Sequence, residues 1–472
     1  MKSISTIFLL FATCFSFAQP NQITQEIDQN AALYKSIAQQ IWANPELGYQ
    51  ETASSALLQK TLKDAGFSIE TGVAGIPTAF IAEFGTGTPV IAVLAEFDAL
   101  PGISQQAVAY KAPVTEGGAG HACGHHLFGT ASVAAGISIK NWLQKSKTPG
   151  TIRVYGTPAE EGGAGKVYMV RAGLFEDVDT VLHWHPNDQN EANASSSLAN
   201  KSAKFRFYGV ASHAAGAPER GRSALDAVEA MNYMTNLLRE HVPQETRIHY
   251  VITSGGEAPN VVPAFAEVFY YVRNPDVANV KSIFERIVKA AEAAALGTET
   301  EMKYEVIHGL YNLLPNETLS RVMFDNLQKV GGIQYTDEER EFARKIAASF
   351  NIETHIDDAA KISAFVVQEK GTGGSTDVGD VSWQVPTAGL GTATWVPGTS
   401  AHTWQAVAAG GTSIGQKGMI NAAKVIALTA AELYKNPNII KKAKEELATR
   451  RGNNTAYEAL IGDREPPLDY RN

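Results

Sequence analysis

Cysteine is scarce in this sequence: only Cys14 and Cys123 occur among 472 residues. Cys14 lies in the apolar run Ile4–Phe17, which follows Lys2 and leads to small residues at Ala18. That arrangement is typical of an export signal that is removed by cleavage. The run is shorter than the ~20 apolar residues that a membrane-spanning helix needs. We therefore expect an exported protein, cleaved near Ala18, in which Cys123 has no partner for an intrachain disulfide.

The sequence also lacks a basic patch and, after the signal, any apolar segment long enough to span a membrane. Lys and Arg number 40 against 49 Asp and Glu, a formal net charge of −9. An acidic surface disfavours nucleic acid and anionic membranes as partners. Hydrophobic residues make up 44% and charged residues 19%, which are globular values, and the length exceeds one ordinary domain.

Short β-branched runs alternate with helical patterns in the first part of the chain. Residues 22–66 are predicted to be helical, and further helices are expected after His125, around 166–172 and over 419–434. Strands are predicted at 78–84, 90–95, 151–155 and 178–182. This alternation predicts an α/β fold with a mixed, mostly parallel sheet that helices cover on both faces.

A second pattern follows, in the order strand, helix, strand, strand, helix, strand. These elements are predicted at 204–208, 224–238, 247–252, 265–273, 277–295 and 301–308. The order is typical of a small ferredoxin-like α+β unit. We therefore predict the following division of the chain: signal 1–18, large domain 19–196 and 312–435, inserted α+β domain 197–311, and a charged tail 436–472 that wraps the surface or stays loose.

Cys123 lies between His121 and His125 in a stretch that begins a predicted helix. Thiolate, imidazole and carboxylate groups together form a ligand set that suits zinc. The Cys-Gly-His motif by itself is weak, because a buried structural cysteine beside a satisfied histidine explains an isolated instance better.

A pair of carboxylates follows the predicted strand 151–155. Glu160 and Glu161 can divide their work, one binding metal and the other acting as a general base. A solvated acidic turn is the common alternative. The glycine-rich residues 162–165 that follow leave room for close approach of the backbone.

Histidines mark two further positions. His183 and His185 end the strand that begins near residue 178, and they face the same side of it. These residues alone do not say which of the two is a ligand. His402 lies in a loop before a helix, where a surface or capping role is the alternative. The joint occurrence of these groups at successive strand ends indicates a metal site.

In their order and spacing, these stretches resemble the dinuclear-metal amidohydrolase and metallopeptidase family of the aminoacylase and carboxypeptidase G type. Within that family they are most similar to the branch that holds the B subunit of aminobenzoyl-glutamate hydrolase. The similarity runs from about residue 25 to the Pro-Pro-Leu near the C-terminus. The matching stretches are 94–105, 120–130, 158–163, 179–186, 210–213, 257–263, 374–380 and 399–404.

The resemblance implies two divalent metal ions, with zinc favoured and manganese as the alternative. The implied ligands are Cys123, His125, Glu161, His185 and His402. Cys123 would stand where other branches carry a bridging Asp. Glu160 would be the general acid/base, and Asp98 would orient a ligand imidazole. His126, where related branches carry Asp or Asn, is a further candidate ligand.

The resemblance also implies roles for the inserted domain. His213 would stabilise the tetrahedral oxyanion in the partner subunit's site. Asn260 and Arg273 would hold the substrate's carboxylate, a task that suits the guanidinium fork. The domain would serve as a lid and supply the contacts of a homodimer, with a hetero-oligomer containing a related subunit as the alternative.

We therefore expect a metal-dependent amidohydrolase that cleaves N-acyl or aroyl amino acids, with aminobenzoyl-glutamate or a related folate fragment as the leading substrate. An exported dipeptidase or aminoacylase of the same family is the nearest alternative. A non-catalytic partner subunit or binding protein is the alternative from another class. Retention of all five implied ligands and of Glu160 argues against that last alternative.

Overall fold

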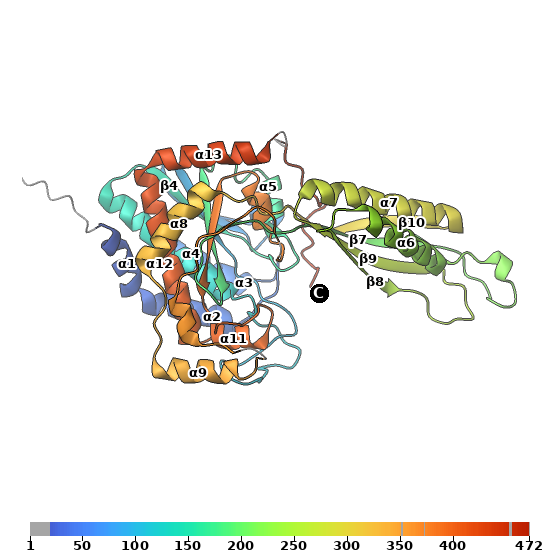
Figure 1. Cartoon of the computed structure of the whole chain (residues 1–472), viewed down its shortest axis with the longest axis horizontal. Helices are drawn as coiled ribbons and strands as arrows, with labels where there is room; N and C mark the ends of the chain where they lie inside the picture. The colour runs from blue at the N-terminus through green and yellow to red at the C-terminus, as the bar shows by residue number, and fades with distance from the viewer. Residues whose placement is uncertain (1–18, 351–352, 372, 453–455, 472) are drawn as a thin grey trace, which may run out of the picture.

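Two domains of different shape make up the molecule: a broad one with helices around a central sheet, and a narrow one with a sheet of its own (Figure 1). The computed structural model describes residues 19–350, 353–371, 373–452 and 456–471. The predicted export signal, residues 1–18, lies outside the described residues. No helix in the described part of the chain combines the length and apolar character needed to cross a membrane.

A six-stranded sheet in the order β1-β2-β4-β3-β5-β12 forms the centre of the large domain. Strands β4, β3, β5 and β12 pair in parallel, whereas β1 and β2 extend the sheet antiparallel at one edge. The predicted mixed, mostly parallel sheet is therefore confirmed. The strands are β1 (Ser68–Thr71), β2 (Phe80–Thr86), β3 (Val90–Ala95), β4 (Gly150–Gly156), β5 (Thr180–Asn187) and β12 (Thr387–Ala393).

Helices cover both faces of this sheet (Figure 1). Helices α3, α4, α8 and α12 pack on one face, and α5 and α10 on the other. The helices of the domain are α1 (Gln19–Gln29), α2 (Ala31–Ala43), α3 (Thr52–Asp64), α4 (His125–Ser146), α5 (Gly165–Arg171), α8 (Glu317–Val330), α9 (Asp337–Ala347), α10 (Val378–Ser382), α11 (Trp404–Gly410), α12 (Ser413–Lys435) and α13 (Pro437–Arg451).

Strand β3 shows why the sheet is covered on both sides. Ile91 and Val93 belong to the core under α4 and α12, whereas Ala92 and Leu94 belong to the core under α5. All six residues of the strand are buried. A continuous apolar run of this kind is typical of a parallel strand between two helical layers.

Strand β12 was not predicted, because its sequence Thr-Ala-Gly-Leu-Gly-Thr-Ala contains little β-branched character. Its glycines are needed for packing against β5. A Cβ at Gly389 would lie 2.3 Å from Nε2 of His183, and one at Gly391 would lie 2.7 Å from the side chain of Asn187. A short parallel pair, β6 (Ala194–Ser195) and β11 (Val367–Gln368), lies outside this sheet.

The small domain has the predicted order of elements. Its antiparallel sheet runs β10-β7-β9-β8, and α6 and α7 cover one face of it. The elements are β7 (Ala199–Tyr208), α6 (Ala224–Leu238), β8 (Arg247–Ser254), β9 (Phe265–Asn274), α7 (Val277–Thr298) and β10 (Glu301–Leu310). The sheet order is that of a ferredoxin-like unit, so this prediction is confirmed.

The segment after residue 436 is more ordered than a loose tail. Helix α13 buries a stripe formed by Ile440, Ala443 and Leu447 at helical spacing. Residues 456–471 then pass between the two domains (Figure 1), and they bury Leu460 and Ile461.

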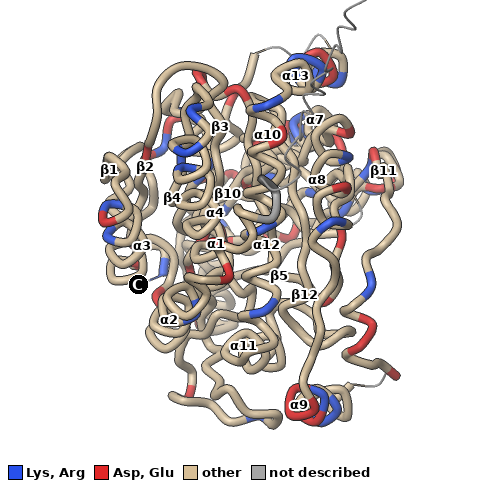
Figure 2. Tube along the Cα trace, turned by 90° about the vertical axis from the view of Figure 1, so that its left-hand side faces the viewer, with Lys and Arg blue, Asp and Glu red and all other residues tan. Residues whose placement is uncertain are grey.

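Charge is mixed over the large domain. Figure 2 shows Lys and Arg interspersed with Asp and Glu along the elements that face the viewer.

Candidate metal centre

The candidate site lies where four parallel strands end. Strand β3 leads to Glu96 and Asp98, and β4 leads to Glu160 and Glu161. Strand β5 carries His185 near its end, and the loop after β12 carries His402. Because β3, β4, β5 and β12 are parallel, their carboxyl ends meet at one edge of the sheet, where α/β proteins place their sites.

The loop before α4 brings Cys123 into this edge. Gly124 has φ 74°, and a Cβ there would lie 2.6 Å from Pro186, so glycine is required for the close approach to β5. The backbone N–H of His402 donates to the carbonyl of Ala122 at 2.9 Å. That bond ties the loop after β12 to the loop that carries Cys123.

His125 is held from one side and left open on the other. Its Nδ1–H donates to Oδ1 of Asp98 at 2.8 Å, which leaves Nε2 as an acceptor in the neutral imidazole. Nε2 lies 3.1 Å from Oε2 of Glu96, which is also an acceptor when ionised. Two acceptors at this distance require a proton or a cation near them.

His185 and Cys123 form the next contact. The Nδ1–H of His185 donates to the carbonyl of Pro186 at 2.7 Å, which turns its Nε2 toward Sγ of Cys123 at 3.4 Å. Burial raises the pKa of the Cys123 thiol far above its ordinary value. A nearby cation is what favours the thiolate form that binds metal.

Glu161 lies against His402 on the more open side. Nε2 of His402 and Oε1 of Glu161 are 2.9 Å apart, and the His402 side chain is 54% exposed against 11% for Glu161. Burial raises the pKa of Glu161, but the hydrogen bond from His402 and the charges of His125 and His402 together outweigh it, so the net direction is downward. The site therefore opens to solvent beside His402.

Asp98 supports both sides of the site. Its Oδ1 accepts from His125, and its Oδ2 accepts from the backbone N–H of Glu161 at 2.9 Å. One fully buried carboxylate thus orients two candidate ligands, an arrangement typical of metal centres.

These side chains form overlapping groups whose ligand atoms lie within 4.8 Å of one another. The groups are Cys123, His125 and His185; Cys123, Glu161 and His402; and Glu96, His125 and Glu160. Among the described residues, Oε2 of Glu96 and Nε2 of His125 are buried without a hydrogen-bond partner. A donor set of thiolate, imidazole and carboxylate with such open atoms fits divalent metal ions.

Glu160 belongs to the group with Glu96 and His125. Burial raises the pKa of Glu160 well above the ordinary value for Glu, and the negative charges of Glu96 and Glu161 raise it further. A carboxyl group with a raised pKa is suited to accept and return a proton near neutral pH.

The loop that carries Glu160 is strained and held from several directions. Ala159 and Ala164 adopt φ of 57° and 59°, a left-handed conformation that costs non-glycine residues of order 1–3 kcal/mol each. The N–H of Ala159 donates to Oε1 of Glu51 at 2.8 Å, and the Tyr49 hydroxyl donates to the carbonyl of Gly163 at 2.7 Å. Such positions persist where surrounding contacts determine them.

A buried lysine supports the site from behind. Lys166 is fully buried, and its Nζ lies 2.7 Å from Oε1 of Glu96 and 2.7 Å from Oδ1 of Asp377. Burial lowers the pKa of Lys166, but the charges of Asp377 and Glu96 outweigh it, so the ammonium stays protonated. Lys166 therefore fixes Glu96 with its second oxygen toward His125.

Two other histidines lie outside the three groups. Nε2 of His126 lies 3.1 Å from the carbonyl of Gly410, and its ring is tilted against the ring of His121, with 5.0 Å between centroids. The ring of His183 lies against Gly389 of β12, and burial lowers its pKa to about 3. Of the two histidines at the end of β5, His185 is the one that the structure places with Cys123.

Two of the small-domain candidates, His213 and Asn260, lie together but apart from these groups. His213 pairs with Val261 in an isolated bridge, and the N–H of Ala214 donates to the carbonyl of Asn260 at 3.0 Å. The ring Nδ1 of His213 accepts from the N–H groups of its own loop.

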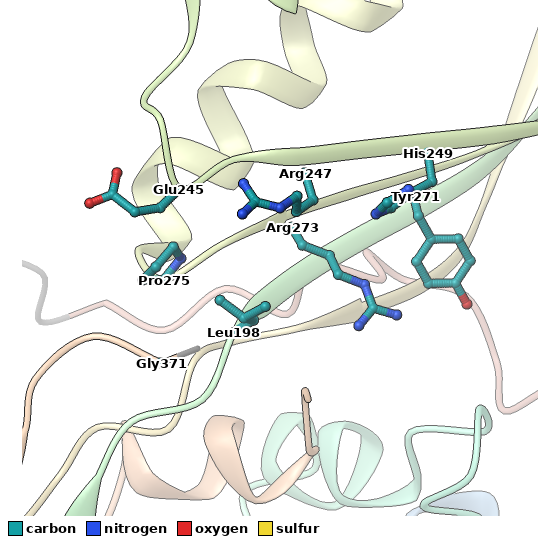
Figure 3. Close-up of a pocket in the computed structure, with 8 residues that line it drawn as sticks. All are labelled: Leu198, Glu245, Arg247, His249, Tyr271, Arg273, Pro275 and Gly371. Carbon is teal, nitrogen blue, oxygen red and sulfur yellow. The ribbon is translucent and has the colours of Figure 1, made fainter. Parts of the chain in front are cut away.

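Arg273 lies elsewhere, in a cavity of about 590 Å³ between the sheet and the loop at Gly371. Arg247 stands directly opposite Arg273 across β8 and β9. Figure 3 shows both guanidinium groups in this cavity, with His249 and Tyr271 beside them. Like charges in directly opposed positions repel, so the cavity favours an anionic ligand.

Sequence reasoning missed four groups that support the site: Glu96, Lys166, Asp377 and the pair of Tyr470 and Arg471 that contacts the Glu161 carbonyl. Glu96 and Asp377 lie in the stretches 94–105 and 374–380 that carry the family resemblance, which was the available signal. Nothing local in the sequence marks Tyr470 or Arg471.

Comparisons with known proteins identify the family of the chain. Residues 199–299 match the peptidase dimerisation domain of the M20 family. The chain is 42% identical over 450 residues, 90% of its length and 94% of the relative's, to the B subunit of p-aminobenzoyl-glutamate hydrolase of Escherichia coli (strain K12). It is 31% identical over 438 residues, 89% and 90% of the two chains, to Xaa-Arg dipeptidase of Mus musculus. The crystal structure of an aminobenzoyl-glutamate utilization protein from Klebsiella pneumoniae superposes with a TM-score of 0.62 at 18% identity, over 88% of this chain and 99% of that one.

Proposed function

The chain belongs to the M20 family of metallopeptidases and amidohydrolases, and from that membership we propose that it hydrolyses the amide bond of N-aroyl amino acids at a centre of two divalent metal ions. One observation carries the proposal: Cys123 belongs to two groups at once, one with His125 and His185 and the other with Glu161 and His402. One ion would be held by Cys123, His125 and His185 and the other by Cys123, Glu161 and His402, with zinc as the favoured metal.

When bound, the two ions polarise the amide carbonyl and lower the pKa of water at the site. The residues of the chain supply the proton transfers. Glu160 takes a proton from the attacking water and later returns it to the leaving nitrogen. Asp98 keeps His125 and the backbone of Glu161 in place during both steps. His213 of a second subunit stabilises the oxyanion.

The charge of the cavity at Arg273 supports an acidic amino acid as the leaving group. Arg247 and Arg273 together offer two guanidinium forks, which match the two carboxylates of glutamate. The same pair repels a substrate that ends in arginine, the kind named for the mouse relative. We therefore propose p-aminobenzoyl-glutamate, or another N-aroyl glutamate, as the substrate.

The test combines metal analysis with hydrolysis of p-aminobenzoyl-glutamate by the purified chain. We expect two metal ions per chain and turnover that falls about 10²- to 10⁴-fold in Glu160→Gln at unchanged metal content. Glu70→Gln, at an exposed position of β1, is the matched control and should keep full activity. A metal-free chain, or turnover that survives Glu160→Gln, would refute the proposal and leave a non-catalytic subunit as the alternative.

A substrate panel separates the glutamate proposal from its dipeptidase rival. Arg247→Ala should raise KM for p-aminobenzoyl-glutamate while leaving KM for the glycine conjugate hippurate nearly unchanged, since the second carboxylate is missing there. Faster hydrolysis of an Xaa-Arg dipeptide than of p-aminobenzoyl-glutamate by the unmodified chain would contradict the assignment.

We also propose that the small domain pairs with that of a second copy. Strand β8 lies at the edge of its sheet and exposes Tyr250, Val251 and Ile252, with Leu237 of α6 53% exposed. An apolar edge strand is a template for pairing with another chain. Light scattering of the purified chain should give the mass of a dimer, whereas a monomer that becomes active only with a related subunit would favour the hetero-oligomer.

Export is proposed from residues 2–18 alone, which have the charged start, short apolar run and small cleavage-site residues of a signal. Mass spectrometry of the protein from its native host should find a mature chain that begins near residue 19. A full-length chain in the cytoplasm would refute the proposal.

A further inference from the structure

Residues 456–471 form a strap that crosses the junction of the two domains. Near its start, the Tyr457 hydroxyl donates to Oδ1 of Asp380 at 2.8 Å. Arg464 then donates to the carbonyls of Val306 and Ile307 in β10, at 2.7 and 2.9 Å. The strap therefore contacts the large domain and the small domain before it reaches the metal centre.

The far end of the strap contacts a candidate metal ligand directly. The Tyr470 hydroxyl donates to the backbone carbonyl of Glu161 at 3.0 Å, and Nη2 of Arg471 donates to the same carbonyl at 2.5 Å. The Tyr470 ring packs edge-to-face against Tyr49, with 5.6 Å between centroids, and the Arg471 guanidinium lies over the Tyr470 ring. Both donors are therefore fixed by packing as well as by the bond to the carbonyl.

Gly48 shows that the fold leaves space for this contact. A Cβ at Gly48 would lie 2.2 Å from the Tyr470 hydroxyl. Any other residue there would push either the hydroxyl or the chain at residue 48 away. The lack of a side chain at Gly48, in the N-terminal part of the large domain, therefore leaves the space that the Tyr470 hydroxyl occupies.

The contact completes the support of a strained loop. Asp98 accepts from the N–H of Glu161, while Tyr470 and Arg471 bind its carbonyl, so the backbone of Glu161 is held on both sides. Ala159 and Ala164, which flank the carboxylate pair, have left-handed backbone angles that need such support. Without the strap, the carbonyl of Glu161 loses both of these donors.

We propose that Tyr470 and Arg471 are positioning residues for the reaction: by holding the Glu161 carbonyl, they aim the carboxylates of Glu160 and Glu161 at the metal centre. Neither side chain needs to touch substrate. Their loss should weaken metal binding and slow the chemical step, because supporting groups of a ligand shell control both. The inference rests on the proposed function for its activity readout, but metal affinity reports on it independently.

The experiment compares the full-length chain with the double variant Tyr470→Phe/Arg471→Ala. We expect metal dissociation constants, measured by competition with a chromogenic chelator, to rise about 10- to 100-fold. The kcat for p-aminobenzoyl-glutamate should fall at saturating metal while KM changes less than threefold. Arg471→Lys should keep much of the wild-type metal affinity, because the lysine ammonium can donate to the carbonyl of Glu161.

Three controls make the outcome decisive. Arg344→Ala, on the exposed face of α9, removes an arginine away from the site and should leave both readouts unchanged. Tyr470→Phe alone keeps the packing against Tyr49 and guards against misfolding of the double variant. Thermal unfolding of all variants identifies a merely structural role, in which the midpoint falls but metal affinity stays. That result, or unchanged affinity and kcat in the double variant, would overturn the proposal. A wild-type chain that binds no metal would instead refute the proposed function.

Discussion

Replacing Asp98 with Asn gives the most direct test of how this metal centre is held. The carboxylate accepts one hydrogen bond through each oxygen, from the ring of His125 and from the backbone of Glu161. An asparagine fits the same space but has one acceptor oxygen and one donor NH₂ group. Whichever way it turns, one of the two N–H donors meets another donor.

The size of the effect follows from these contacts. A hydrogen bond to a charged group contributes about 1.5–3 kcal/mol, and the substitution removes one and weakens the other by removing the charge. Loss of a group that orients ligands typically costs about 10- to 100-fold in metal affinity, or roughly 1.4–2.7 kcal/mol. Because His125 and Glu161 belong to different ligand groups, we expect both ions to bind more weakly.

The assay is a titration of metal-free protein with Zn²⁺ against a fluorescent chelator, for the wild type and for Asp98→Asn. Asp64→Asn, at an exposed position of α3, serves as the matched control. Circular dichroism should show the same secondary structure in all three proteins. Affinities for both ions within twofold of the wild type would refute the idea that Asp98 orients the ligands.

Three further substitutions test other parts of the structure. Cys123→Ser should lower metal occupancy while the fold survives, because a hydroxyl ionises less readily than a thiol; unchanged metal content would make the thiol merely structural. Lys166→Met leaves Glu96 and Asp377 without their buried cation, and chemical denaturation should show a loss of about 3–5 kcal/mol; a loss below about 1 kcal/mol would contradict the ion-pair assignment. Burial raises the pKa of Asp380 to about 7, above its value in the unfolded chain. The contribution of this carboxyl group to the free energy of unfolding is therefore fully present below about pH 4 and is lost as the pH rises through 7. Asp380→Asn should therefore be more stable than the wild type at pH 8, by about 4 kcal/mol at most, and the difference should disappear near pH 4; a pH-independent difference would count against the shift.

The fold could be predicted where local sequence and packing agree. Strand β3 has the bounds expected from its β-branched run, and the inserted domain shows the expected order of elements. Strand β12 was not predicted because its glycines are needed for packing against side chains of β5, and β5 is distant in the sequence. Helix propensity and strand propensity carry no information about such pairings.

The candidate site could also be predicted only in part. Local motifs and the family resemblance nominated Cys123 and the other candidate ligands, and the structure brings these side chains into overlapping groups. The supporting groups could not be predicted, because each depends on a partner far along the chain: Lys166 and Asp377 are 211 residues apart, and Glu161 and Arg471 are 310 apart. The roles of the candidate ligands stay predictions until metal binding is measured.

The pairing of β5 with β12 sets an order for assembly on the ribosome. Strand β5 and the complete inserted domain are synthesised before β12, so the edge of β5 that β12 will cover emerges with no strand beside it. An unpaired edge of a buried strand invites contacts with other chains. Meanwhile the inserted domain, whose strands pair only among themselves, can fold as a unit. The nascent chain therefore carries a folded inserted domain before the candidate metal centre is complete, because His402 follows β12 in the sequence.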